Sequence, residues 1–87
     1  MTVYVDKANI KYGRMIMCHM LSESLDELHA MADIIGVNRK WFQHQTRTPH
    51  YDICLAKKKL ALQHGAKEIT RQEVAKLCKI IRVNNLS

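Results

Sequence analysis

Hydrophobic and polar positions along the chain divide it into short apolar runs and longer amphipathic segments. Residues 2–5 form a β-branched and aromatic run, which predicts a first strand. Residues 15–21 are apolar at almost every position, which predicts a central strand covered on both faces, although periodicity alone also admits a buried helix. Further short strands are expected through Trp41-Phe42 and over residues 66–69.

Helices are predicted where capping signals precede apolar residues at helical spacing. Ser24-Leu25-Asp26-Glu27 has the form of a capping box, and Gly36 is a typical residue to end the helix that follows. Thr70-Arg71-Gln72-Glu73 is a second capping box, and the apolar positions after it follow the spacing of an amphipathic helix. Between them, Asp52 is expected to cap a helix over about 53–64.

The expected order is β-β-α-β-α-β-α, so the predicted fold is a small α/β domain with a short, mostly parallel sheet. We expect one domain over residues 1–83 and a frayed tail over 84–87. The direction of the first strand is left open, because residues 7–14 are short enough for a hairpin. Asp6 would then lie at the far end from His19, and it is left out of the predicted site.

A candidate site follows from the rule that ligands bind outside the carboxyl ends of parallel strands. The central strand ends near His19, and His50, Tyr51 and Asp52 precede the predicted second helix, whose free amides attract anions. Arg14 could clamp the same anion with two hydrogen bonds. The predicted ligand-binding residues are these five, with His19 and His50 as the candidate catalytic groups.

Each of these residues also has a structural explanation. Asp52 can serve as a helix cap, His19 can be a hydrogen-bonded core histidine, and Tyr51 can pack its ring in the core. No metal and no cofactor are expected. Cys18 and His19 are adjacent and would point to opposite faces of a strand, and the paired cysteine spacings of structural zinc sites are absent.

Charge and cysteine content bear on partners and location. The 87 residues include 14 Lys and Arg against 8 Asp and Glu, a net charge of +6, which favours anionic partners such as a nucleotide or nucleic acid, or simply a solvated basic surface. Three cysteines without a CxxC pair favour a reducing compartment, and Cys18 and Cys78 are expected to be buried, inert thiols. No apolar stretch is long enough for a membrane span, so a cytoplasmic protein is expected.

Several short motifs together resemble a family of short bacterial and phage proteins catalogued as a domain of unknown function. The resemblance covers about residues 1–75 and brings no activity with it. The sequence pattern of that family includes the positions of Arg14, His19, His29 and the triplet His50-Tyr51-Asp52. The motifs that carry it are Thr2-Val3-Tyr4-Val5-Asp6, Tyr12-Gly13-Arg14, Met17-Cys18-His19-Met20, Glu27-Leu28-His29-Ala30, Trp41-Phe42-Gln43, His50-Tyr51-Asp52 and Gly65-Ala66.

Three functions remain open from the sequence. The leading hypothesis is a binding protein for a phosphate-bearing ligand, either a nucleotide or nucleic acid, that uses the Arg, His, Tyr and Asp residues above. A phosphoester-hydrolase-type enzyme could use the same residues for acid–base chemistry. The third is a non-catalytic phage or host protein-interaction module, which would bind a protein partner through an exposed face such as the basic side of the last helix, where Arg82 lies. None of them implies a membrane or a particular oligomeric state.

Overall fold

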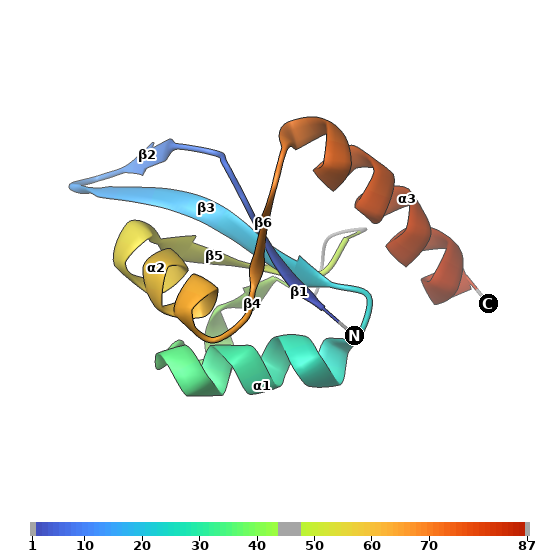
Figure 1. Cartoon of the computed structure of the whole chain (residues 1–87), viewed down its shortest axis with the longest axis horizontal. Helices are drawn as coiled ribbons and strands as arrows, with labels where there is room; N and C mark the ends of the chain where they lie inside the picture. Colours follow the sequence, from blue (N-terminus) through green and yellow to red (C-terminus); the bar gives the residue numbers. More distant parts are fainter. Residues whose placement is uncertain (1, 44–47, 87) are drawn as a thin grey trace.

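A mixed sheet forms the middle layer of the protein, with helices on both of its faces (Figure 1). The computed structural model describes residues 2–43 and 48–86. The sheet has the strand order β4-β5-β3-β1-β6, and β2 pairs with β3 outside this path. The bounds of the strands are β1 Val3–Asp6, β2 Ile10–Tyr12, β3 Met15–Ser22, β4 Phe42–Gln43, β5 His50–Cys54 and β6 Lys67–Ile69.

The sheet is mostly antiparallel, so the prediction of a mostly parallel sheet is wrong. Among the described residues, β1 and β6 are the only strands that pair in parallel. Strand β3 pairs antiparallel with β1, β2 and β5, and β4 pairs antiparallel with β5. The physical reason is the short connection before β3. It contains β2, and Gly13 turns the chain back with a positive φ of 60° that favours glycine. A parallel neighbour would have needed a long crossover there.

The two capping boxes begin helices as predicted. In α1, Leu25–Ile35, the Ser24 hydroxyl accepts the backbone N–H of Glu27, and Gly36 ends the helix in the left-handed conformation. In α3, Arg71–Leu86, Thr70 and Glu73 exchange both bonds of the box, at 3.1 and 3.2 Å. Helix α3 continues beyond Val83, the expected end of the domain, into the segment that was expected to be a frayed tail. Residue 87 of that tail lies outside the described residues.

The segment around Asp52 is a strand, not the start of a helix. His50–Cys54 forms β5, and α2 spans Leu55–Gln63 with Cys54 at its N-cap and no side-chain capping bond. The sequence His-Tyr-Asp-Ile-Cys alternates in burial along β5, as expected for a strand between two different environments. The expected cap role of Asp52 is therefore wrong.

Alternation along the strands sends their side chains to two separate cores. One face of the sheet packs on α1 and α2 through residues such as Val5, Met20, Tyr51 and Ile53. The other face packs on α3 through a smaller cluster, Leu21, Ile69, Leu77 and Ile81. Helix α3 leaves part of that second face uncovered. Among the described residues, no helix is long and apolar enough to cross a membrane.

The region predicted as a third strand begins with a short helix. Residues Arg39–Trp41 form the 3-10 helix η1, and Trp41 is 58% exposed beside the Lys40 ammonium group. Phe42, the first residue of β4, packs against the larger core instead. At this point of the chain Phe42 therefore contributes to the core and Trp41 does not.

Candidate functional site

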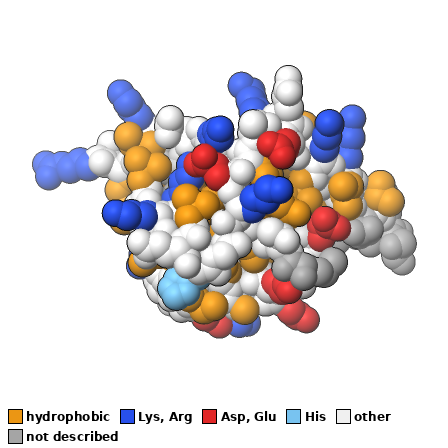
Figure 2. Space-filling view, in the orientation of Figure 1, with side chains coloured by type: hydrophobic (Ala, Val, Ile, Leu, Met, Phe, Trp, Pro, Cys, Tyr) orange, Lys and Arg blue, Asp and Glu red, His pale blue; other side chains and the backbone are white. Residues whose placement is uncertain are grey.

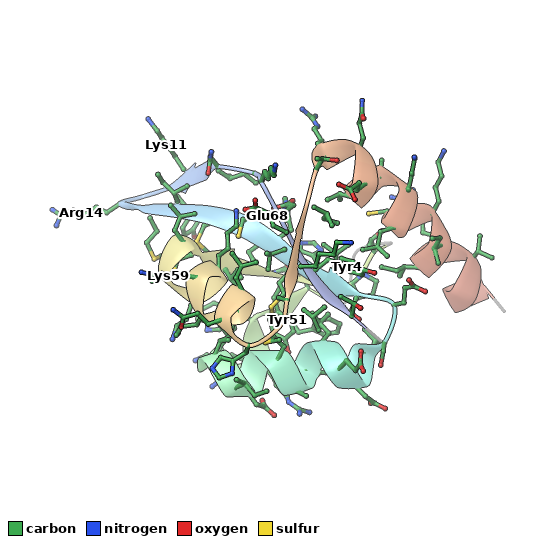
Figure 3. All side chains as sticks on the ribbon, in the orientation of Figure 1. Tyr4, Lys11, Arg14, Tyr51, Lys59 and Glu68 are labelled. Atoms are coloured by element: carbon green, nitrogen blue, oxygen red, sulfur yellow. The ribbon has the colours of Figure 1, made fainter. Side chains whose placement is uncertain are left out.

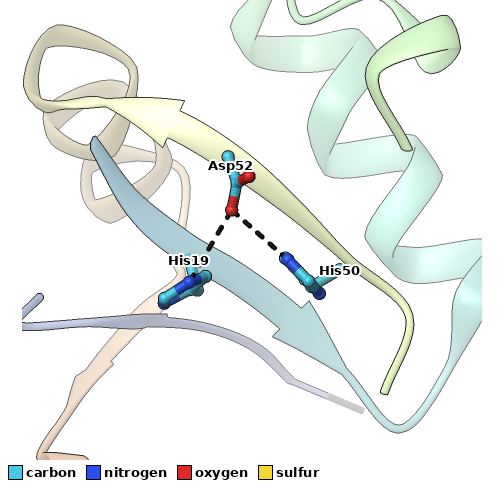
Figure 4. Close-up of side chains that lie close together, drawn as sticks. All are labelled: His19, His50 and Asp52. Atoms are coloured by element: carbon cyan, nitrogen blue, oxygen red, sulfur yellow. Dashed lines mark ion pairs between the residues drawn. The ribbon is translucent and has the colours of Figure 1, made fainter. Parts of the chain in front are cut away.

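Four polar side chains lie together on the sheet face that α3 only partly covers. Asp6 comes from the end of β1. His19 comes from the middle of β3, and His50 and Asp52 come from β5 (Figure 4). Strand register explains the grouping. Val5 pairs with Met20, so the adjacent residues on the two strands, Asp6 and His19, project from the opposite face to that pair. Asp52 pairs with His19 and therefore projects from the same face as Asp6 and His19.

Asp6 and His19 form the most buried polar pair of this group. The Asp6 carboxylate accepts His19 Nδ1–H at 2.6 Å, and its other oxygen accepts the backbone N–H groups of His19 and Ala8. Burial by itself raises the pKa of Asp6, but the hydrogen bonds from His19 outweigh it and lower that pKa below its usual value. The same side-chain hydrogen bond raises the pKa of His19, against the opposing effect of burial.

His50 and Asp52 complete the group on the neighbouring strand. His50 Nδ1 lies 2.9 Å from the carbonyl oxygen of Thr48, which can only accept a hydrogen bond, so this nitrogen carries the proton. Asp52 Oδ1 lies 3.3 Å from His50 Nε2 and 3.7 Å from His19 Nε2 (Figure 4). The two imidazole rings meet edge to face, with their centroids 5.2 Å apart.

A hollow of about 270 Å³ opens beside the two histidines. Its polar walls are His19, His50, Thr48 and Arg82. Three side chains, those of Leu21, Val74 and Cys78, form its apolar part. The hollow therefore lies between the sheet and α3 and combines imidazole groups, one guanidinium and an apolar surface. Such a combination can bind an anion, and the imidazoles can exchange protons with it.

The structure brings together three of the five predicted site residues. His19, His50 and Asp52 are grouped as described. Arg14 lies at the tip of the β2–β3 hairpin and points away from the sheet (Figure 3), five residues before His19, which corresponds to about 16 Å of extended strand. The expectation that it shares a site with His19 fails because the strand between them is extended.

Tyr51 lies on the opposite face of β5 from its two neighbours in the sequence. It is fully buried between the sheet and α1 (Figure 3), and its hydroxyl is 2.7 Å from His29 Nδ1. Burial raises the pKa of this phenol. The structural explanation of Tyr51, ring packing in the core, is therefore the one observed, and the alternation of side chains along a strand is its cause.

Two residues of this region were missed by the sequence reasoning. Asp6 was excluded because a simple hairpin would place it far from His19, but β2 takes the start of β3 as its partner and β1 pairs farther along. Arg82 was read only as part of the basic face of the last helix.

Cys18 offers a first test of the packing behind His19. The side chain is fully buried, and burial raises the pKa of its thiol to about 11, so the reactive thiolate is almost absent at neutral pH. We expect Cys18 to resist thiol-modifying reagents in the folded protein and to react after denaturation. Peptide mapping by mass spectrometry measures this, with the half-buried Cys54 and Cys78 as internal controls.

Modification of Cys18 in the folded protein at the same rate as Cys78 would contradict the burial. The expectation of a buried thiol holds for Cys18 in the structure, whereas Cys78 is half-buried and lines the hollow.

Comparison with known proteins adds a family but no activity. The family model described as "Protein of unknown function (DUF4031)" matches residues 3–81. No curated protein and no solved structure gives a significant match to the chain.

Proposed function

The chain belongs to this family, whose description assigns no activity, and we propose from the geometry of the hollow that it binds a phosphate-bearing ligand of nucleotide size. The observation that carries the proposal is the meeting of His19, His50 and Arg82 in the walls of one hollow. Protonated imidazole, through its Nε2–H, and guanidinium are donors that suit phosphate oxygens, and a guanidinium can hold two of them at once.

Arg82 is available for such a contact. It lies on the exposed side of α3 and forms no ion pair with any of the described residues. Other Lys and Arg side chains project at many points over the hairpin and α3 (Figure 2). This distributed charge attracts anions to the whole surface, whereas Arg82 supplies a cation at one defined place.

The size and apolar part of the hollow support a small ligand. Its volume of about 270 Å³ is near the lower end of the range for small-molecule sites. Leu21, Val74 and Cys78 offer an apolar surface to the uncharged part of the ligand, such as a sugar or base. A single nucleotide, or one nucleotide of a longer strand, fits this description better than a duplex does.

The test is a binding titration of metal-stripped protein with mononucleotides and inorganic phosphate at low salt. We expect Arg82→Ala to weaken binding by about tenfold, equivalent to about 1.4 kcal/mol, because one charge-assisted contact is lost. Arg14→Ala is the matched control, since it removes the same charge from the hairpin tip and should leave affinity within about twofold.

Two results would overturn the proposal. One is the absence of binding by the unaltered protein to all of these ligands at low salt. The other is an equal loss of affinity in Arg14→Ala and Arg82→Ala, which would mean that binding depends on net charge and not on the hollow.

A further inference from the structure

The polar group beside the hollow has the composition of a metal centre. We propose that His19, His50 and Asp52 bind one divalent transition-metal ion of the zinc type, through the Nε2 atoms of the two histidines and a carboxylate oxygen of the aspartate. Two imidazoles and one carboxylate are a ligand set typical of catalytic metal sites, in which a further position stays open for water or substrate.

The distances between the three ligand atoms fit a metal at their centre. One ligand atom from each residue lies within 4.8 Å of the other two, and Asp52 Oδ1 is 3.3 Å from His50 Nε2 and 3.7 Å from His19 Nε2. A tetrahedral zinc ion with bonds of about 2.0–2.1 Å separates its ligand atoms by about 3.3–3.4 Å. Charge-assisted hydrogen bonds between nitrogen and a carboxylate are shorter, about 2.7–2.9 Å. The two nitrogen–oxygen separations therefore match metal ligands better than charge-assisted hydrogen bonds.

The other nitrogen of each histidine is already held by an acceptor. Asp6 Oδ2 lies 2.6 Å from His19 Nδ1, and the Thr48 carbonyl oxygen lies 2.9 Å from His50 Nδ1. Each acceptor places a proton on Nδ1, so the neutral ring keeps its lone pair on Nε2, the atom that faces Asp52. A carboxylate or carbonyl behind a ligating histidine is the usual outer partner of a metal site, where it fixes both tautomer and ring orientation.

The backbone holds the three ligands before any metal binds. His19 and Asp52 are register partners on the adjacent strands β3 and β5, and His50 is two residues from Asp52 on the same strand. Side chains at such positions share one face of the sheet. The site is also accessible, because the side chains of His19, His50 and Asp52 are 33%, 20% and 43% exposed. A metal ion can therefore enter without unfolding the sheet.

This site is a separate claim from phosphate binding, although the two features adjoin. His19 and His50 belong both to the ligand set and to the walls of the hollow. A metal ion there would offset the negative charge of Asp52 at the edge of the hollow and provide an open position for an oxygen ligand. The proposal departs from the expectation that no metal is bound. That expectation rested on the adjacent positions of Cys18 and His19 and on the absence of the paired cysteine spacings of structural zinc sites.

The experiment uses full-length protein without a histidine tag, stripped of metal and kept free of phosphate and nucleotides. Calorimetric titration with Zn²⁺ is expected to give one site per chain, and Co²⁺ is expected to give the visible absorption of a low-symmetry N/O site. Asp52→Asn and His50→Ala should each weaken Zn²⁺ binding by about 100-fold or more. Loss of a residue that only hydrogen-bonds to a metal ligand typically lowers metal affinity by about 10–100-fold, so the expected loss is that of a ligand. Circular dichroism before titration identifies any variant that fails to fold.

The matched control is His64→Gln, which removes an exposed imidazole at the end of α2 and should leave Zn²⁺ affinity unchanged. Asp52→Asn keeps the size of the side chain, so it tests the ligand even where His50→Ala is unfolded. Absence of stoichiometric binding by the unaltered protein would overturn the proposal. So would equal Zn²⁺ affinity in folded Asp52→Asn and the unaltered protein. Because phosphate is absent, neither result depends on whether the hollow binds nucleotides.

Discussion

Replacing Tyr51 with alanine should lower the free energy of unfolding by about 3–5 kcal/mol, the usual cost of removing a large buried aromatic ring. Tyr51 is fully buried, and its ring contacts those of Phe42 and His29 at centroid distances of 5.3 and 5.8 Å. The whole stability of a domain is about 5–15 kcal/mol, so the variant should lose a large part of it. Denaturant unfolding followed by circular dichroism measures the change.

Two further variants show how much of this loss in unfolding free energy is due to the Tyr51 hydroxyl and how much would follow from removing an exposed aromatic ring. Tyr51→Phe removes only the hydroxyl that lies 2.7 Å from His29 Nδ1, and should cost about 1 kcal/mol. Trp41→Ala removes a larger ring that is 58% exposed, and should cost less than about 1 kcal/mol. If Trp41→Ala proved more destabilising than Tyr51→Ala, the described core would be wrong.

Replacing Asp6 with alanine should lower the free energy of unfolding by about 2–4 kcal/mol, because buried donors lose their acceptor. The Asp6 side chain is only 7% exposed and accepts three hydrogen bonds, from His19 Nδ1 and from the backbone N–H groups of His19 and Ala8. The matched control is Asp33→Ala, whose carboxylate pairs with Arg39 on the exposed surface, where solvent screens the pair, so its loss should destabilise the protein much less.

The pH dependence of stability in the metal-free protein should carry the signature of the same pair. The pKa of His19 is raised, so its contribution is complete below the unfolded value near 6.5 and is lost as pH rises through the folded value. The pKa of Asp6 is lowered, so its contribution is present above the unfolded value near 3.8 and is lost as pH falls through the folded value.

Unfolding curves of the unaltered protein and Asp6→Ala at several pH values test this expectation. The difference in stability between them should be greatest between the unfolded pKa values near 3.8 and 6.5, and should shrink below and above that interval. A difference that stays the same at pH values below and above that interval would show that Asp6 acts through its shape and not through the charged pair.

The sequence by itself determined the features that depend on neighbouring residues. Ser24 and Glu27 begin α1, Thr70 and Glu73 begin α3, and Gly36 ends α1, because capping bonds join residues at most a few positions apart. The central strand was also predicted from its apolar run, but burial on both faces holds only for its later part, because Met15 and Ile16 are exposed. These signals are local and survive any choice of sheet topology.

The tertiary structure alone decided which polar residues meet. His50, Tyr51 and Asp52 are adjacent in the sequence, yet a strand sends Tyr51 to the core and its neighbours to the opposite face. Arg14 and His19 are close in the sequence, yet extended backbone separates them. Asp6 and His19 meet because β1 pairs with the later half of β3. Strand pairing joins residues distant along the chain, and its register follows from the burial of whole faces, a condition that no short segment expresses.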